Sequence, residues 1–92
     1  MALVRCEVLE GPRPGFKTVG IPSITGNLEY LTIEEQFLSR YEGDLLLPVW
    51  VVGRDAHYQT ALVALPDEAD SGARRVWVRL SDLVFKPDEV PA

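Results

Sequence analysis

The chain has 92 residues, of which 9 are Lys or Arg and 14 are Asp or Glu, and its net charge at pH 7 is −5. A chain of this length forms one domain with one modest core, and its hydrophobic fraction of 47% excludes a largely disordered protein. The acidic balance argues against binding to nucleic acid or to an anionic membrane, because both require a basic surface.

The first half of the chain predicts three strands separated by loops rich in proline and glycine. The strands are expected at residues 3–11, 16–21 and 28–33, and the turns at "GPRPG" and "PSITGN". Alternation in the first strand places Val4, Cys6 and Val8 on one face. A cysteine between two valines predicts a buried, poorly reactive thiol.

The segment at residues 32–43 fits two structures. Thr32 followed by Glu35 has the spacing of a capping box, and an aromatic or aliphatic residue recurs at every fourth position from Ile33. A short helix ending at Gly43 satisfies this pattern. Alternation of apolar residues fits a long bent strand equally well, so both structures remain open at this stage.

The second half of the chain predicts three further strands. They are expected at residues 44–53, 60–65 and 75–80, with a hairpin loop at 54–59, an acidic loop at 66–73 and one turn at "SDL". The strand at 44–53 is apolar on both faces, which is typical of a central strand. Pro48 has no N–H to donate, so it predicts an edge or a bulge at that position.

These elements predict a mainly β protein, a small barrel of five to six antiparallel strands with at most one short helix. Short strands with turn signals between them are typical of sandwiches and barrels, and closure into a barrel removes exposed strand edges. The expected domain spans residues 1–86. A flexible tail is expected at residues 87–92, which hold two prolines and two acids.

Two stretches carry a resemblance to known small barrels. The hairpin "LLLPVWVVGRDAHYQTALVALP" followed by "ARRVWVRLSDL" resembles the C-terminal half of SH3-like barrels, which implies an SH3-like fold. The ALYDY-like stretch and the paired tryptophans of peptide-binding SH3 domains do not occur in the sequence, so the resemblance implies no proline-rich ligand groove. "VLEGPRPGFKTVGI" resembles the strand–loop–strand of KOW-type ribosome-associated barrels.

The cysteine count and the hydropathy pattern bear on location. Cys6 is the single cysteine, so the chain has no internal disulfide and fits a reducing compartment. The N-terminus lacks the apolar core of a signal peptide. The longest apolar run, "LLLPVWVV", is too short to cross a bilayer. We expect a cytoplasmic protein without a membrane partner.

The residues capable of chemistry do not form a catalytic or metal-binding set. His57 and Asp55 in "RDAHY" lack a third group. The acids in "PDEADSG" lack the alternating spacing of an EF-hand loop. "GPRPG" lacks the lysine and the length of a phosphate-binding loop. We therefore expect no enzymatic activity, no cofactor and no metal.

The strand at 75–80 contains the strongest binding signal in the sequence. Val76, Val78 and Leu80 fall on one face, and Trp77 falls on the other between two arginines. Burying two guanidinium groups without partners is costly, so the face with Trp77 is expected to reach water. The alternative is that Trp77 packs under another element while the arginines extend to solvent.

Tryptophan, tyrosine and arginine are the residues enriched at binding hot spots. The predicted binding residues are Trp50, Tyr58, Arg75, Trp77 and Arg79. They indicate a non-enzymatic module that binds a protein partner, or a second copy of itself, through an aromatic and arginine face. A ligand-binding or enzymatic protein whose site forms only on oligomerisation is the alternative. A nucleic-acid-associated barrel ranks last because of the charge.

Overall fold

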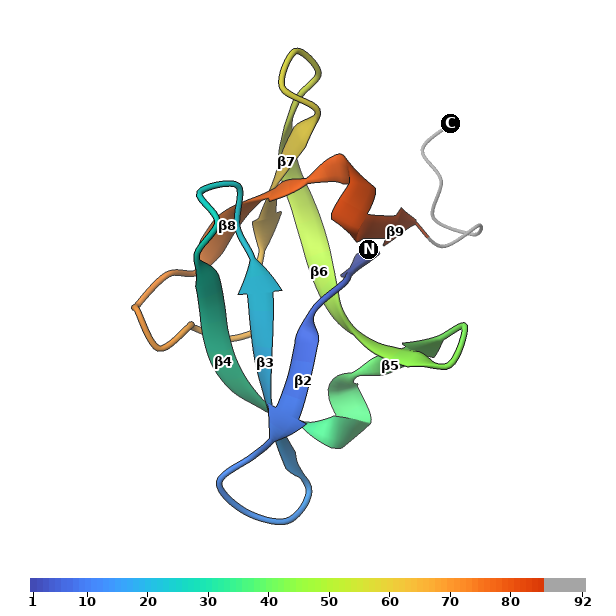
Figure 1. The fold of residues 1–92 in the computed structure, drawn as a ribbon, viewed down its shortest axis with the longest axis vertical. Coiled ribbons are helices and arrows are strands. Elements are labelled where there is room, and N and C mark those ends of the chain that lie inside the picture. The colour runs from blue at the N-terminus through green and yellow to red at the C-terminus, as the bar shows by residue number, and fades with distance from the viewer. Residues whose placement is uncertain (86–92) are drawn as a thin grey trace.

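The protein is a small antiparallel β structure, seen here in a computed structural model that describes residues 1–85 (Figure 1). Within these residues the strands are β1 Ala2–Val4, β2 Glu7–Glu10, β3 Phe16–Pro22, β4 Leu28–Glu34, β5 Ser39–Tyr41, β6 Asp44–Asp55, β7 Thr60–Ala64, β8 Arg75–Arg79 and β9 Leu83–Phe85. Single 3₁₀ turns occur at η1 Glu35–Phe37 and η2 Leu80–Asp82. The expected domain end at residue 86 and the tail at 87–92 lie outside the described residues.

The strands form two curved sheets around one core. The larger sheet has the order β8-β7-β6-β1-β9, with β5 also paired to β6, and the smaller sheet has the order β2-β3-β4. All strand pairs are antiparallel. Figure 1 shows β2, β3 and β4 side by side, with the long β6 strand running past them. The predicted mainly β, barrel-like architecture is confirmed, although residues 1–85 form more strands than expected.

The core lies between the facing sides of the two sheets. Its buried side chains come from both sheets and are mostly β-branched residues or leucine, which pack well on a pleated surface. The smaller sheet contributes Val19, Ile21, Leu31 and Ile33, and the larger sheet contributes Ala2, Val4, Leu47, Val49, Ala61, Val63, Val76, Val78 and Leu83. Interdigitation of these two sets excludes water from the interior.

The strand predicted at residues 3–11 is divided between the two sheets. The chain leaves β1 at Arg5, turns, and enters β2 at Glu7. The N–H of Arg5 donates to the carbonyl oxygen of Asp82 at 2.8 Å, which fixes this corner against η2. The sequence did not predict β9, whose three residues gain their partner only by pairing with β1.

The helix considered for residues 32–43 does not form, and the bent strand is correct only in part, because a 3₁₀ turn divides it. Thr32 stays in β4, opposite Thr18 of β3, and the strand continues to Glu34. Only one 3₁₀ turn follows, and no side chain caps it. Pairing with β3 therefore overrides the local helical pattern. The chain then enters β5, which pairs with β6 through a tight turn at Gly43 with φ of +88°.

The irregularity expected at Pro48 lies farther along β6. Pro48 pairs with Leu3 of β1. On the other side of β6, pairing with β5 ends at Leu46 and pairing with β7 begins at Trp50, so Pro48 lies between these two ladders. Its missing N–H therefore removes no bond from either of those two ladders. The register shift occurs between Val51 and Gly53. A bulge there increases the local twist of β6 and leaves Val52 exposed.

Candidate functional site

The two faces of β8 differ in the way the alternation predicted. Val76 and Val78 are buried in the core, whereas Trp77 is 39% exposed and its two arginine neighbours are exposed. Trp77 therefore lies at the surface and is not packed under another element. Leu80 departs from the prediction because it begins η2 and is only partly buried.

Strand register places Trp50 on the same outer face as Trp77. Ala64 of β7 lies opposite both Trp50 of β6 and Arg75 of β8, while Leu62 lies opposite Trp77. Directly opposed residues point to the same side of a sheet. We call this outer surface of β6, β7 and β8 the aromatic face; its residues are Trp50, Val52, Leu62, Ala64, Arg75, Trp77 and Arg79.

Both ends of the aromatic face are open to solvent. Trp50 is 47% exposed and Val52 is 48% exposed at the β6 side, and Trp77 is exposed at the β8 side. Among residues 1–85, neither Arg75 nor Arg79 pairs with an acidic side chain or lies over an aromatic ring. Both positive charges are therefore available to a partner.

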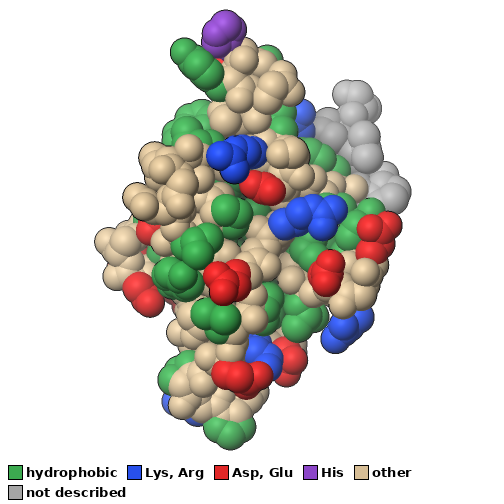
Figure 2. Space-filling model, viewed as in Figure 1, with side chains coloured by type: hydrophobic (Ala, Val, Ile, Leu, Met, Phe, Trp, Pro, Cys, Tyr) green, Lys and Arg blue, Asp and Glu red, His purple; other side chains and the backbone are tan. Residues whose placement is uncertain are grey.

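Tyr58 was predicted to join this surface and instead lies at the tip of the β6–β7 hairpin. It is 72% exposed, and its ring meets the ring of His57 edge-on at 4.7 Å between centroids. The histidine marks this tip at the top of Figure 2. Tyr58 lines a shallow hollow with Ile24 and Arg79, so it borders the aromatic face at its β8 end only.

The His57 and Asp55 pair forms a turn. One carboxylate oxygen of Asp55 accepts the backbone N–H of His57 at 3.0 Å and that of Tyr58 at 3.2 Å. This bonding is typical of an Asp residue that starts a loop. The carboxylate of Asp55 therefore binds backbone N–H groups of the hairpin, and it does not orient the imidazole of His57.

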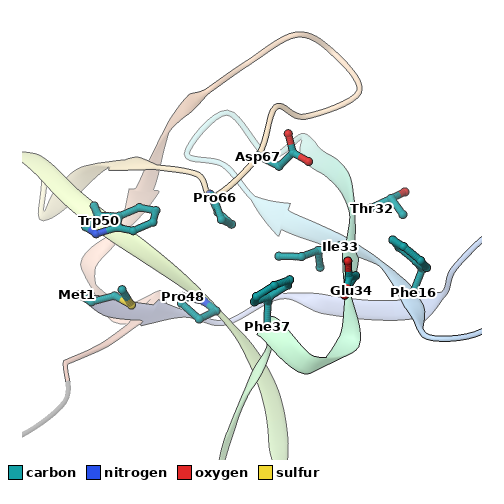
Figure 3. A pocket seen from close by; sticks show the side chains of 10 residues that line it. All are labelled: Met1, Phe16, Thr32, Ile33, Glu34, Phe37, Pro48, Trp50, Pro66 and Asp67. Atoms are coloured by element: carbon teal, nitrogen blue, oxygen red, sulfur yellow. The ribbon is translucent and has the colours of Figure 1, made fainter.

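A second surface feature was not predicted from the sequence. Figure 3 shows a pocket of about 460 Å³ between β4, η1, β6 and the start of the loop after β7. We call it the apolar groove; it is lined by Met1, Phe16, Thr32, Ile33, Glu34, Phe37, Pro48, Trp50, Pro66 and Asp67. Phe37, in the segment for which the sequence left helix and strand open, is 56% exposed at its wall.

Cys6 is partly buried beside the core. Its Sγ–H donates to the carbonyl oxygen of Leu45 at 3.9 Å. Burial raises the pKa of the thiol from 9.0 to about 11, so the thiol stays protonated at neutral pH. A protonated thiol is a poor nucleophile, in agreement with the predicted low reactivity.

The acidic loop at residues 66–73 is held by local contacts. Glu68 pairs with Arg74 at 3.1 Å, and Ser71 donates to Glu29 at 2.8 Å. The N–H of Asp70 donates to the carbonyl oxygen of Tyr30 at 2.7 Å, which fastens the loop to β4. Across residues 1–85, no group of three or more His, Cys, Asp or Glu side chains is arranged to hold a metal ion.

Comparisons of the chain with protein-family models, with curated proteins and with solved structures gave no match. In the part of the chain that the structure describes, no helix has the length and apolar character needed to cross a membrane. Function must therefore be argued from the surfaces themselves.

Proposed function

We propose that the protein is a non-enzymatic interaction module that binds a protein partner through the aromatic face. The observation that carries the proposal is the exposure of Trp50 and Trp77 on one sheet surface, separated only by two apolar residues of β7. A sheet exposed to water usually carries polar residues on its outer side. An outer side that carries two tryptophans, a valine and a leucine is typical of a binding surface.

The charges on this face indicate the chemistry of the partner. Arg75 and Arg79 flank Trp77 on β8 and have no acidic partner within residues 1–85. Guanidinium groups bind carboxylates with two parallel hydrogen bonds. The complementary surface is an apolar patch bordered by Asp or Glu side chains.

We infer further that the barrel is of the SH3-like type and that the protein works in the cytoplasm. The order of the last elements supports an SH3-like barrel. A long hairpin is followed by β8, one 3₁₀ turn and β9, and β9 pairs with the N-terminal strand β1. The single, partly buried cysteine supports a cytoplasmic location, because a protein without disulfides suits a reducing compartment.

A second copy of the chain is the alternative occupant of the aromatic face. Measurement of the molecular mass in solution by light scattering distinguishes the two cases. A monomer favours a different protein as the partner. A closed oligomer that Trp77→Ala dissociates favours self-association, and a pocket between its subunits would favour a ligand or substrate site shared between copies.

The direct test is affinity capture with the intact protein as bait, followed by quantitative mass spectrometry. Trp77→Ala removes the central side chain of the aromatic face, and Leu9→Ala removes an equally exposed apolar side chain from the smaller sheet. We expect a partner that the wild type and Leu9→Ala both retain and Trp77→Ala loses. Loss of binding above about 0.2 M salt would indicate a nucleic acid, because phosphate contacts are strongly salt-dependent.

A further inference from the structure

β4 has one side that is free to pair with another strand. In an antiparallel strand, successive residues direct their N–H and C=O groups to opposite sides. The carbonyl oxygen of Tyr30 accepts from the N–H of Asp70, so the backbone groups of Tyr30 point away from β3. The N–H of Glu35 donates to the carbonyl oxygen of Gly15, just before β3, so the backbone groups of odd-numbered residues point toward β3. Thr32 and Glu34 therefore direct their backbone groups away from β3.

These backbone groups have no partner in the described part of the chain. The loop at residues 66–73 covers the edge of β4 at Tyr30, and no backbone hydrogen bond from residues 1–85 reaches the outer side of Thr32 or Glu34. An open strand edge is a template for an added strand, and proteins usually cover it or shorten it. Within residues 1–85, this edge is left open beside a pocket.

The apolar groove lies directly along this edge. Thr32 and Glu34 line it on one side, and Phe37, Pro48, Trp50 and Pro66 supply its apolar walls (Figure 3). Its volume of about 460 Å³ falls in the range of small-ligand pockets. A strand paired to β4 would direct alternate side chains into this space.

Charge distinguishes between the occupants of the groove. The charged side chains that line it, Glu34 and Asp67, are both acidic. A second copy pairing edge to edge through β4 would bring the Glu34 carboxylates of two chains of net charge −5 together. A segment that carries Lys or Arg gains from the same carboxylates. The groove therefore favours a basic partner over self-association.

We propose that the edge of β4 at Thr32–Glu34 binds an extended segment of a partner protein as an added strand. An apolar side chain of that segment fills the apolar groove, and a neighbouring Lys or Arg contacts Glu34 and Asp67. This site differs from the aromatic face in backbone, charge and partner chemistry, and Trp50 belongs to both. Trp77 does not line the groove and Thr32 is not on the aromatic face, so variants at these two residues test the two surfaces separately.

A proline substitution tests the added strand. Thr32→Pro removes the outward N–H, and proline is tolerated on an edge strand where its N–H would face solvent. Thr32→Val keeps the N–H and is the matched control. The probe is a displayed library of random twelve-residue peptides selected on the intact protein. The wild type and Thr32→Val should enrich peptides that alternate apolar and basic residues, and Thr32→Pro should reduce their binding at least tenfold.

A charge reversal tests the same site without altering the backbone. Glu34→Lys with Asp67→Lys should abolish the enrichment of basic peptides while the unfolding midpoint stays close to that of the wild type, since Asp67 is exposed, Glu34 is only half-buried, and each carboxylate accepts a hydrogen bond only from a neighbour in sequence. Selected peptides no more basic than the input library, or equal selection by this variant, would overturn the proposal. Selection lost with Trp77→Ala but kept with Thr32→Pro would assign the peptides to the aromatic face instead.

Amide hydrogen exchange with a selected peptide locates the binding. The N–H groups of Thr32 and Glu34 should exchange rapidly in the free protein and at least tenfold more slowly in the complex. Protection that grows with protein concentration in the absence of peptide would show a second copy on this edge. Protection confined to β7 and β8 would also contradict strand addition to β4.

Discussion

The inner and outer faces of the sheet formed by β6, β7 and β8 have the same backbone but opposite environments. On the inner face, Val63, Val76 and Val78 belong to the same buried cluster as the core residues of the smaller sheet and are shielded from water. On the outer face, Trp50 and Trp77 remain substantially exposed. Folding explains the inner face completely, since each of its side chains lies in the core.

Nothing in the packing of residues 1–85 requires an outer face with two tryptophans. Threonine or lysine at these positions would form the same ladder and expose less apolar surface. The difference between the faces shows which apolar residues stabilise the fold and which are free to serve another purpose. Substitutions matched across the sheet measure this difference.

The largest contrast is expected from one substitution made on each face. Val78→Asp places a charge in the core, so the free energy of unfolding should fall by about 4 kcal/mol or more and cooperative folding should be lost. Val52→Asp changes an exposed side chain, so the loss should be below about 1 kcal/mol. Urea denaturation followed by circular dichroism measures both. Equal losses would mean that the faces are assigned wrongly.

A smaller effect is expected when side chains are truncated. Trp77→Ala should cost about 1–2 kcal/mol, because part of the indole already contacts water in the folded state. Val78→Ala removes far fewer atoms but leaves a cavity, so it should cost at least as much, about 2 kcal/mol. The unfolding midpoints of the two variants decide the comparison. A Trp77→Ala variant much less stable than Val78→Ala would show that Trp77 is a core residue.

The pH dependence of stability tests whether Cys6 is shielded. Burial raises its pKa from 9.0 to about 11, so between these pH values the unfolded chain loses the thiol proton while the folded chain keeps it. The free energy of unfolding should therefore decrease as pH rises through this range. We expect a decrease of about 1 kcal/mol, less than the full shift because the thiol is only partly buried.

Cys6→Ala serves as the control for this titration. Every other titratable group is present in both proteins, so the difference between the two pH profiles isolates Cys6. Parallel profiles, or rapid labelling of the native thiol at neutral pH, would show that Cys6 is exposed.

The smallest effect on stability is expected from the arginines. Arg75→Ala and Arg79→Ala remove exposed charges without a partner among residues 1–85, so each should change the free energy of unfolding by less than about 0.5 kcal/mol. Each should nevertheless weaken partner binding about fivefold or more if its charge meets a carboxylate. Arg40→Ala, at an exposed position of β5, is the control: it removes one long hydrogen bond, at 3.3 Å to the carbonyl oxygen of Gly43, so it should change stability little and partner binding not at all. Unchanged affinity in both variants would remove the arginines from the site.

Short-range features of this protein were readable from its sequence. The faces of β8 follow from the period of two along a strand, which depends on neighbouring residues only. The loops around β3 and β4 follow from proline and glycine for the same reason. That local signal was sufficient to place Trp77, Arg75 and Arg79 on an exposed face.

Features created by distant parts of the chain were not readable. Thr32 remains in β4 because β3 lies beside it, although its local sequence resembles a helix start. β9 exists only because β1 is its neighbour. Phe37 and Pro66 are distant in sequence but line the same groove. The strand register likewise places Trp50 and Trp77 on one face, with β7 between them. Tyr58 lies in the hairpin loop that the sequence predicted, but only the folded structure shows that this loop extends beyond the sheet.

Comparative capture with three baits tests most directly that the outer face exists for binding. Wild type, Leu9→Ala and Trp77→Ala are immobilised at equal amounts after circular dichroism has shown that all three are folded. We expect at least one protein to be retained by the wild type and Leu9→Ala and to be depleted at least fivefold with Trp77→Ala. Capture that is equal on all three baits, or no protein retained above the blank support, would contradict a binding role for the aromatic face.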